Sequence, residues 1–403
     1  MRHLPPIPAA IGAATTGTLP VFLTGALSVQ IRETLHLDEA RLGLAVAAFF
    51  GAAALSSAPA GRLAERIGAV RQMRAGVLLA SACSLSIALA ARTWWALPLL
   101  LVVGGVANGA IQPAANLLLA RRVDTARQGF AFGAKQAAIP LSTLIAGLAV
   151  PAVALTVGWH YAFALATALG LAVALMLPGR PAPTRPSGAG RPKDGSTTGD
   201  PIPRTASSIT VTLVVLTGAM ALGSAAANSL GTFVVPGAVR AGFQPGTAGF
   251  LAALGSASGL SARLMAGLRA DRRGRNHLRA VAYMLAAGAL GYLGLAAGLR
   301  PLDVLAVVVA FAAGWGWPGL FNFAVVRSHS HQPAWATGIT QTGAYLGGTI
   351  GPFVFGVVAE HASYRAAWGM DALLALCAAG GMLVAREILH RRRALIGIEP
   401  LDA

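Results

Sequence analysis

Apolar runs long enough to cross a lipid bilayer recur along the whole chain. A transmembrane helix needs ~20 predominantly apolar residues, and runs of this length alternate with short polar breaks from one end of the sequence to the other. Only 11% of the 403 residues are charged, against roughly 25% in an ordinary soluble domain. One soluble core would not require so many separate apolar runs, so the sequence predicts an integral membrane protein.

Twelve spans are predicted from the apolar runs and the polar breaks between them. They cover residues 7–29, 42–60, 73–91, 95–120, 130–156, 160–178, 209–235, 246–268, 277–298, 302–326, 335–360 and 364–386. An unpaired backbone amide in hydrocarbon costs several kcal/mol, so each span must be a helix. The expected fold class is therefore an all-α integral membrane protein with twelve transmembrane helices.

One long polar segment divides the chain into two parts of similar length. Residues 179–208 are rich in Pro, Gly and Arg and show no helical period, which is typical of a flexible connection. We expect an N-terminal six-helix bundle over residues 1–178 and a C-terminal bundle over residues 209–403, which includes a short basic tail.

The distribution of basic residues predicts the orientation in the membrane. With alternating loops on opposite sides, 24 Lys and Arg residues fall on the side of the linker, six fall on the other side, and Lys135 lies within a span. Cytoplasmic loops are enriched in Lys and Arg. The N- and C-termini are therefore expected in the cytoplasm, and the chain in the cell membrane.

The two halves carry similar sequences at a nearly constant offset, which indicates duplication. Gly61-Arg-Leu-Ala-Glu65-Arg66-Ile-Gly68 resembles Gly267-Leu-Arg-Ala-Asp271-Arg272-Arg-Gly274, 206 residues later, and Asn116 aligns with Asn322 at the same offset. Gly133-Ala-Lys135-Gln136 aligns with Gly338-Ile-Thr340-Gln341 at an offset of 205, and Trp159 and Phe163 align with Tyr364 and Trp368.

The duplicated loop resembles the signature loop of the major facilitator superfamily, in which Gly, an acid, Arg, Gly and a second basic residue follow the second span. Gly61, Glu65, Arg66, Gly68 and Arg71 carry the pattern here, with Glu65 where the family more often has Asp. The resemblance covers essentially the whole chain. It implies two pseudo-symmetric six-helix bundles that move a small molecule by alternating access, with the substrate between them.

Two patterns of drug/proton antiporters in this family are missing. The apolar part of the fourth span has no Arg, and the fifth span has Pro140 and Pro151 in place of a Gly-Pro pattern. Gly351-Pro352 is similar to that pattern but lies in the eleventh span. These departures favour another type of transporter over a multidrug antiporter.

The resemblance implies a conformational latch at the duplicated loop, which closes the cytoplasmic side when the protein opens outward. Its candidate residues are Gly61, Glu65, Arg66, Gly68 and Arg71, with Gly267, Asp271, Arg272 and Gly274 in the second copy. Each acid can pair with a neighbouring Arg and with the N-terminus of an adjacent helix. The alternative is a solvated charged loop that only sets topology.

Amide side chains form a polar stripe on the fourth span. Asn108, Gln112 and Asn116 are spaced four residues apart, so they share one helix face. Polar side chains in a bilayer face the bundle interior, and the resemblance places spans one, four, seven and ten around a central cavity. Asn228 and Asn322 are candidates for the opposite wall, and one of Trp315 and Trp317 is expected to reach it. Hydrogen bonding within one half is the alternative role.

Lys135 lies inside the predicted fifth span, and Lys193 in the linker is the only other lysine. A charge at a helix centre costs ~2.5–3.5 kcal/mol on insertion scales, so it normally has a partner or a function. The resemblance places the fifth span beside the eighth. Lys135, Gln136, Arg263 and Gln341 are therefore predicted to form a cationic site for an anionic group. Snorkelling of Lys135 to the membrane surface is the alternative.

These observations favour a secondary transporter of a small organic solute, anionic or polar, because the expected cavity helices carry amides and basic groups but no acid. A coupling proton is a further expected partner. A proton-coupled efflux pump for drugs or metabolites and a transporter-like receptor are the alternatives.

Other classes of function lack support in the sequence. No nucleophile elbow, phosphate loop or metal-ligand cluster lies in the expected context, so neither an enzyme nor a cofactor nor a metal site is predicted. The charge of +17 lies in loops between spans and does not predict nucleic-acid binding. A monomer is expected.

Overall fold

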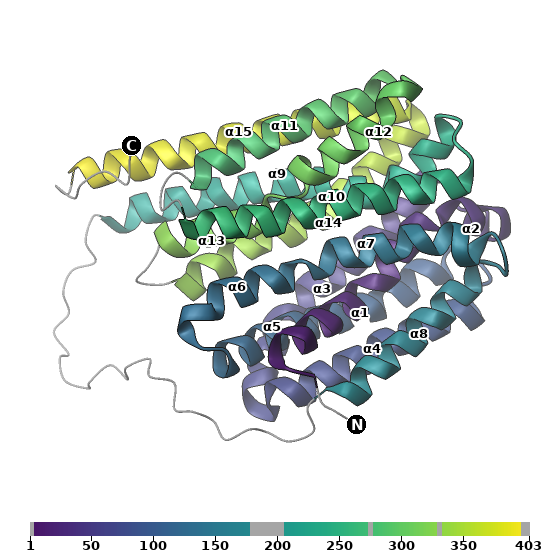
Figure 1. Cartoon of the computed structure of the whole chain (residues 1–403), viewed down its shortest axis with the longest axis horizontal. Helices are drawn as coiled ribbons and strands as arrows, with labels where there is room; N and C mark the ends of the chain where they lie inside the picture. Colours follow the sequence, from purple (N-terminus) through teal and green to yellow (C-terminus); the bar gives the residue numbers. More distant parts are fainter. Residues whose placement is uncertain (1–3, 178–204, 273–276, 329–332, 396–403) are drawn as a thin grey trace.

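The computed structural model describes residues 4–177, 205–272, 277–328 and 333–395. Within these ranges every regular element is helical, with fifteen α-helices and two π-helical segments and no strand. The helices run back and forth along the long axis of the molecule (Figure 1). The predicted all-helical architecture is confirmed.

The N-terminal half contains the first eight α-helices, shown in purple to teal in Figure 1. Their bounds are α1 Pro6–Ala26, α2 Ser28–Leu35, α3 Glu39–Ile67, α4 Ala69–Ala90, α5 Ala96–Arg122, α6 Thr125–Gln136, α7 Ala138–Ala149, the π-helix η1 Val150–Ala154 and α8 Trp159–Met176. Consecutive pieces α1–α2 and α6–α7–η1 each form one span, so this half crosses the molecule six times.

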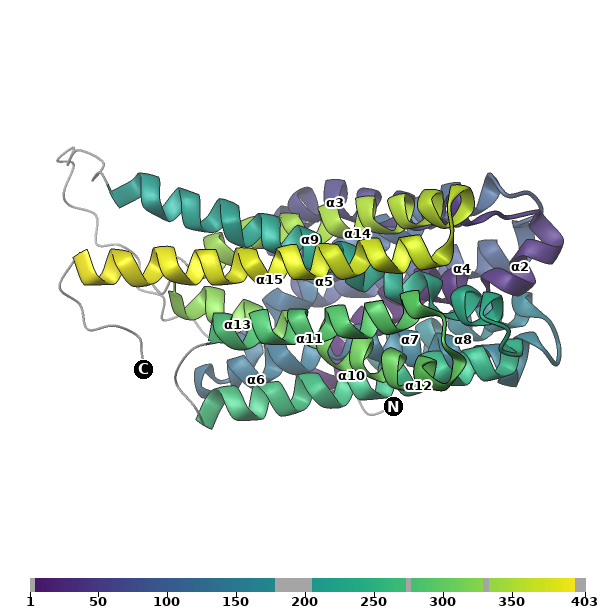
Figure 2. The same ribbon diagram turned by 90° about the horizontal axis from the view of Figure 1, so that it is seen from above.

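The C-terminal half repeats this arrangement. Its elements are α9 Thr205–Arg240, α10 Pro245–Arg272, α11 His277–Ala297, α12 Arg300–Val309, the π-helix η2 Ala310–Gly314, α13 Pro318–Ser328, α14 Pro333–His361 and α15 Tyr364–Leu395. Helix α9 begins at Thr205, inside the segment predicted as linker, and the linker residues 179–204 lie outside the described ranges. The views in Figures 1 and 2 show the two halves packed side by side with their helices nearly parallel.

Eleven helices among the described residues are long and apolar enough to cross a membrane. Helix α10 is not one of them, because glycine, serine and Arg263 lower its hydropathy. It nevertheless packs along α7 and η2 like the other spans. Many large apolar side chains face outward, such as Leu55, which is 84% exposed. Such a surface suits contact with lipid.

Two predicted spans are not continuous helices. The fifth span turns at Ala137, between α6 and α7, and the tenth breaks between η2 and α13 at Trp315–Trp317. Proline explains both positions, because it has no backbone N–H to donate to the carbonyl four residues earlier. Pro140 thereby leaves the carbonyl of Gln136 free, and Pro318 leaves that of Gly314 free.

The halves meet along an interface whose two ends we name separately. The linker end is the end at which α3 and α5 finish and α9 begins, and the distal end is the opposite one. Helix α3 packs along α14 and α7 along α10 (Figure 2). Helix α1 packs along α9. Small residues at these contacts let the backbones approach closely, as is typical of helix pairs in membranes.

Candidate functional site

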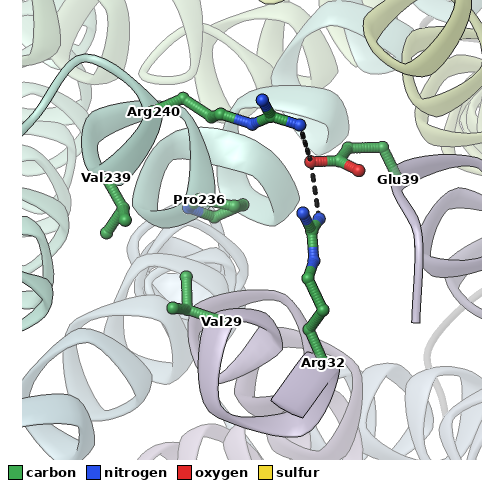
Figure 3. A pocket seen from close by; sticks show the side chains of 6 residues that line it. All are labelled: Val29, Arg32, Glu39, Pro236, Val239 and Arg240. Carbon is green, nitrogen blue, oxygen red and sulfur yellow. Dashed lines mark ion pairs between the residues drawn. The ribbon is translucent and has the colours of Figure 1, made fainter. Parts of the chain in front are cut away.

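A buried carboxylate lies at the distal end of the interface. Glu39, the first residue of α3, is 2% exposed. Its Oε1 is 2.5 Å from Nη2 of Arg32 on α2 and 3.7 Å from Nη2 of Arg240 on α9 (Figure 3). Arg32 belongs to the same half as Glu39, whereas Arg240 belongs to the other half. The Glu39 carboxylate therefore joins the two halves electrostatically, beside a small pocket that Val29 and Val239 also line.

Two residues of the C-terminal half complete what we call the distal cluster: Arg32, Glu39, Arg240, Glu360 and Tyr364. The Tyr364 hydroxyl donates to Oε1 of Glu39 over 3.3 Å. The backbone N–H of Glu39 donates to Oε2 of Glu360 over 3.1 Å. Glu360, at the end of α14, thus satisfies one of the free amides at the start of α3. The distal cluster links five helices from both halves.

Backbone packing closes the interface next to the distal cluster. A Cβ added to Gly25 of α1 would lie 2.8 Å from the carbonyl oxygen of Thr232 on α9. Added Cβ atoms would also clash at Gly43 with the carbonyl of Pro352, and at Gly356 with the carbonyl of Glu39. Phe22 of α1 makes an edge contact with Trp315, with ring centroids 5.6 Å apart. The distal half of the interface therefore leaves no room for a side chain at Gly25, Gly43 or Gly356.

The linker half of the interface is packed differently. A Cβ added to Gly133 of α6, Gly319 of α13 or Gly338 of α14 would meet no heavy atom within 4 Å. Asn116, near the linker end of α5, is exposed. Among the described residues, the close backbone contacts between the halves lie at the distal end and not around these glycines.

The polar stripe of α5 runs from the packed region to the open one. Asn108 is buried, and an added Cβ on Gly17 of α1 would be 3.3 Å from its Oδ1. Gln112 is half-buried and donates to Oδ1 of Asn108 over 3.2 Å. Asn108 is therefore buried beside α1, whereas Gln112 and Asn116 are accessible, and the role of the stripe in binding stays a prediction.

Lys135 is buried at the end of α6 and does not snorkel to the surface. Its side chain is 6% exposed, and its Nζ donates to Oδ1 of Asn116 over 2.8 Å. No salt bridge pairs it with a carboxylate in the described part of the chain. A buried ammonium has three N–H donors, so one amide oxygen leaves most of its hydrogen-bonding capacity for another acceptor.

Arg263 bridges the two helix breaks. It is 7% exposed, and its Nη1 donates to the carbonyl of Gln136 over 2.6 Å. Its Nε and Nη2 donate to the carbonyl of Trp315 over 3.1 and 2.7 Å. The Gln136 carbonyl is available because Pro140 cannot donate to it, and a cation is favourable at the C-terminal end of a helix. Arg263 therefore ties α10 to both broken spans, and one of them belongs to the other half.

Both tryptophans of the tenth span lie in the turn after η2 and not inside a continuous helix, which corrects the predicted position. Trp315 points to the interface and contacts Phe22 and Phe311. Trp317 is fully buried within the C-terminal half, where its Nε1 donates to the free carbonyl of Gly314 over 3.0 Å. Of the two rings, only that of Trp315 reaches the other half.

Three predicted binding residues are not joined to Lys135 by any contact among the described residues. Asn228 is half-buried and donates to the carbonyl of Ser224 in its own helix over 2.8 Å. Asn322 and Gln341 are half-buried on α13 and α14. Their role in binding stays a prediction.

Among the described latch residues, no hydrogen bond or ion pair forms a latch. Gly61, Glu65, Arg66, Gly68 and Arg71 are described, and no hydrogen bond or ion pair joins the exposed Glu65 carboxylate to another described residue. In the second copy the backbone of Gly267, Asp271 and Arg272 belongs to α10, but their side chains lie outside the described set, as does all of Gly274. The latch stays a prediction.

No group of three metal-ligating side chains lies close together in the described ranges. One membrane-embedded acid has no partner there either. Asp371 of α15 is fully buried, and neither of its carboxyl oxygens is hydrogen-bonded. Such a carboxyl group is far cheaper to bury in its neutral form.

The sequence interpretation missed the distal cluster. Arg32 and Glu39 lie in a short polar break between the first two predicted spans, and Glu360 ends the eleventh, so each resembles an ordinary loop charge. The available signal was the presence of acids at the distal ends of spans from different halves. Only the fold shows that these ends meet.

The comparisons agree with this architecture. No curated protein sequence matches the chain. Among solved structures, a bacterial homologue of the human lysosomal transporter Spinster, inward-facing and occupied, matches with a TM-score of 0.73 and 16% identity, over 94% of this chain and 96% of that chain. The same homologue, inward-facing and unoccupied, gives a TM-score of 0.66 and 16% identity over 95% of both chains.

A D-xylose–proton symporter is also similar in structure, with a TM-score of 0.69 and 15% identity over 93% of this chain and 95% of that chain. At these identities the likeness shows the fold alone. The family model of the major facilitator superfamily matches residues 9–334, which is most of the sequence. Together with the duplicated loop and the two helical halves, this match shows that the chain belongs to the major facilitator superfamily of transporters.

Proposed function

We propose that this protein is a secondary transporter that moves a small anionic or polar organic solute across the cell membrane by alternating access. The linker end faces the cytoplasm in this proposal, because the basic residues of the sequence are concentrated on that side. The distal end then faces outward.

The observation that carries the substrate class is the environment of Lys135. This ammonium group is buried, bonded to the amide of Asn116, and without a carboxylate partner among the described residues. Intramembrane cations usually pair with an acid or mark a substrate or ion pathway. An anionic group of the solute is the partner that would complete this site.

The unequal packing of the two ends supports transport. Close backbone contacts and the distal cluster seal one end, while Gly133, Gly319 and Gly338 have open space around them at the other. Alternating access requires that no more than one end be open at a time. In the proposed orientation this state opens to the cytoplasm, and both similar structures of the bacterial Spinster homologue are also inward-facing.

A proton-coupled efflux pump is the second candidate, and Asp371 is the observation that favours it. A neutral buried carboxyl group can release and rebind a proton. Asp371 lies on α15, however, and contacts none of the predicted binding residues. An effect of a proton gradient on flux that Asp371→Asn abolishes would support the pump over a uniporter.

Substitution of Lys135 tests the substrate class. Lys135→Ala is expected to abolish binding of an anionic solute, and Lys135→Arg to restore it only in part, because the guanidinium is larger and has a fixed geometry. Thermal shifts of purified protein with a panel of small anions, sugars and drugs would detect binding, since a ligand of the folded state raises its apparent stability.

Arg127→Ala is the matched control, because it removes an exposed cation from the same helix α6. Flux into proteoliposomes, measured with the solute that binds, separates a transporter from a receptor. Wild-type affinity for the anion in Lys135→Ala would contradict the proposed site. Binding without flux in the wild-type protein would favour the receptor.

A further inference from the structure

Two carboxyl groups from opposite halves meet at the distal end. The backbone N–H of Glu39 donates to Oε2 of Glu360 over 3.1 Å, which places the Glu360 carboxyl group directly beside Glu39. The two acidic side chains influence each other electrostatically. Two carboxylates at this range repel unless one of them carries a proton. One of the two carboxyl groups must therefore carry a proton for this contact to be attractive.

The surroundings of the pair distinguish its two members. Glu39 is buried and receives Arg32, Arg240 and the hydroxyl of Tyr364, all on Oε1. These partners stabilise its ionised form. Its other oxygen remains available to accept a hydrogen bond from a protonated carboxyl group.

Glu360 has the opposite environment. It is exposed to solvent, lies at the C-terminal end of α14, and belongs to none of the salt bridges of the distal cluster. The negative end of the α14 dipole, the Glu39 carboxylate and the nearby Asp38 all disfavour a second negative charge there. Among the described residues, the amide of Glu39 is the group in contact with Glu360 that favours ionisation.

We propose that Glu360 binds a proton when the distal end is closed and donates it to Glu39, so that closure of this end depends on the pH of the solution at that side. Loss of the proton places two negative charges in contact across the interface and weakens the closed state. The idea rests on the proposed function in one respect, because it treats the distal end as a gate.

Linkage gives the expected size of the effect. The closed state binds one more proton than the open state, so the ratio of closed to open molecules changes by up to tenfold per pH unit in the range where Glu360 titrates. The sign follows directly: low pH at the distal side favours closure, and high pH favours opening.

Spin labels at Thr93 and Leu299 provide the test, because both residues are exposed, lie in distal loops and belong to different halves. Cys83 and Cys377 would first be replaced by alanine. Double electron–electron resonance in nanodiscs then measures the closed fraction from pH 5 to 9. The wild-type protein should open as the pH rises, whereas Glu360→Gln should remain closed and lose the pH response, since its neutral amide can still donate to Glu39.

Glu33→Gln is the matched control, because it removes an exposed distal carboxylate that no contact joins to the distal cluster, and it should keep the wild-type response. A wild-type pH response retained in Glu360→Gln would overturn the proposal. Open and closed populations whose ratio does not change with pH in the wild-type protein would also overturn it. A single distance under all conditions would instead contradict the gate, and with it the proposed alternating access.

Discussion

The distal and linker ends of the interface are built from the same duplicated helices but differ in how they hold the halves together. At the distal end, backbone meets backbone at Gly25, Gly43 and Gly356, and the buried Glu39 collects cations from both halves. At the linker end, a Cβ added to Gly133, Gly319 or Gly338 would meet no heavy atom within 4 Å. The duplication supplies the scaffold, whereas the contacts of Glu39 and of the three distal glycines hold the distal end together.

Between these ends, Arg263 connects the halves at mid-depth. It uses carbonyls that proline and the turn at Trp315 release from the helical ladder, so it needs no acid. An arginine bonded in this way is a structural tie in this state. Of the two buried cations, Arg263 and Lys135, the lysine has fewer of its hydrogen-bond donors in use.

The largest effect is expected from a methyl group at the distal contact. Gly356→Ala places a Cβ against the carbonyl of Glu39, and backbone on both sides cannot move independently. Overpacking of this kind costs about 1–3 kcal/mol, so the ratio of closed to open molecules at the distal end should fall roughly 5- to 150-fold. The spin-label distance between Thr93 and Leu299 measures this change in the ratio of closed to open molecules.

Gly338→Ala is the matched substitution at the linker end, where nothing lies within 4 Å. It should leave the closed fraction unchanged and stabilise α14 by up to ~1 kcal/mol, since alanine is the better helix former. If Gly356→Ala and Gly338→Ala changed the ratio of closed to open molecules equally, the two ends would not differ in packing.

An intermediate effect is expected from the bridge at mid-depth. Arg263→Met leaves the carbonyls of Gln136 and Trp315 without their donor, which should lower the free energy of unfolding by about 1–3 kcal/mol. Pro140→Ala restores an N–H that can bond to Gln136 within the helix. In a Pro140→Ala background the cost of Arg263→Met should therefore shrink.

Thermal unfolding of the two single variants and the double variant measures this coupling as a double-mutant cycle. Strictly additive effects would mean that Arg263 does not donate to the Gln136 carbonyl, which Pro140 leaves without a donor.

The smallest effect is expected at Glu65. The carboxylate has no partner among the described residues in this state, so Glu65→Gln should destabilise only a state in which the linker end closes. An exposed ion pair is worth ~0.2–1 kcal/mol. A cysteine at position 338 should consequently react faster with a thiol reagent in the variant than in otherwise wild-type protein.

Glu387→Gln is the control, because Glu387 lies on the linker-side part of α15 and pairs with Arg391 in its own helix. If Glu65→Gln and this control label at the same rate, Glu65 is a solvated loop residue and not part of a latch.

The sequence predicted most of the fold because hydrocarbon permits few alternatives. The apolar runs and the duplicated loop led to the spans and to the family, which the structure and the family model confirm. The break at Trp315 was predictable in principle, since Pro318 removes a donor inside the run. The run is nevertheless apolar throughout, and hydropathy does not distinguish a continuous helix from a broken one.

The candidate site was harder to predict, because it depends on tertiary contacts. The bond between Lys135 and Asn116 brings together two residues that were predicted separately, on the fifth and fourth spans. Arg263 was predicted as a ligand for an anion, yet its donors are used by backbone carbonyls that only the breaks expose. The distal cluster depends on helix ends that are more than 300 residues apart in the chain, as for Glu39 and Glu360.

Paired distance measurements at both ends test the central claim, that the closed distal end and the open linker end are two positions of one alternating device. One pair of spin labels at Thr93 and Leu299 reports the distal end, and a second pair at the exposed Arg121 and Arg327 reports the linker end. When Gly356→Ala opens the distal end, the linker-end distance should decrease in the same proportion of molecules. A linker-end distance that stays constant or increases as the distal end opens would contradict the account.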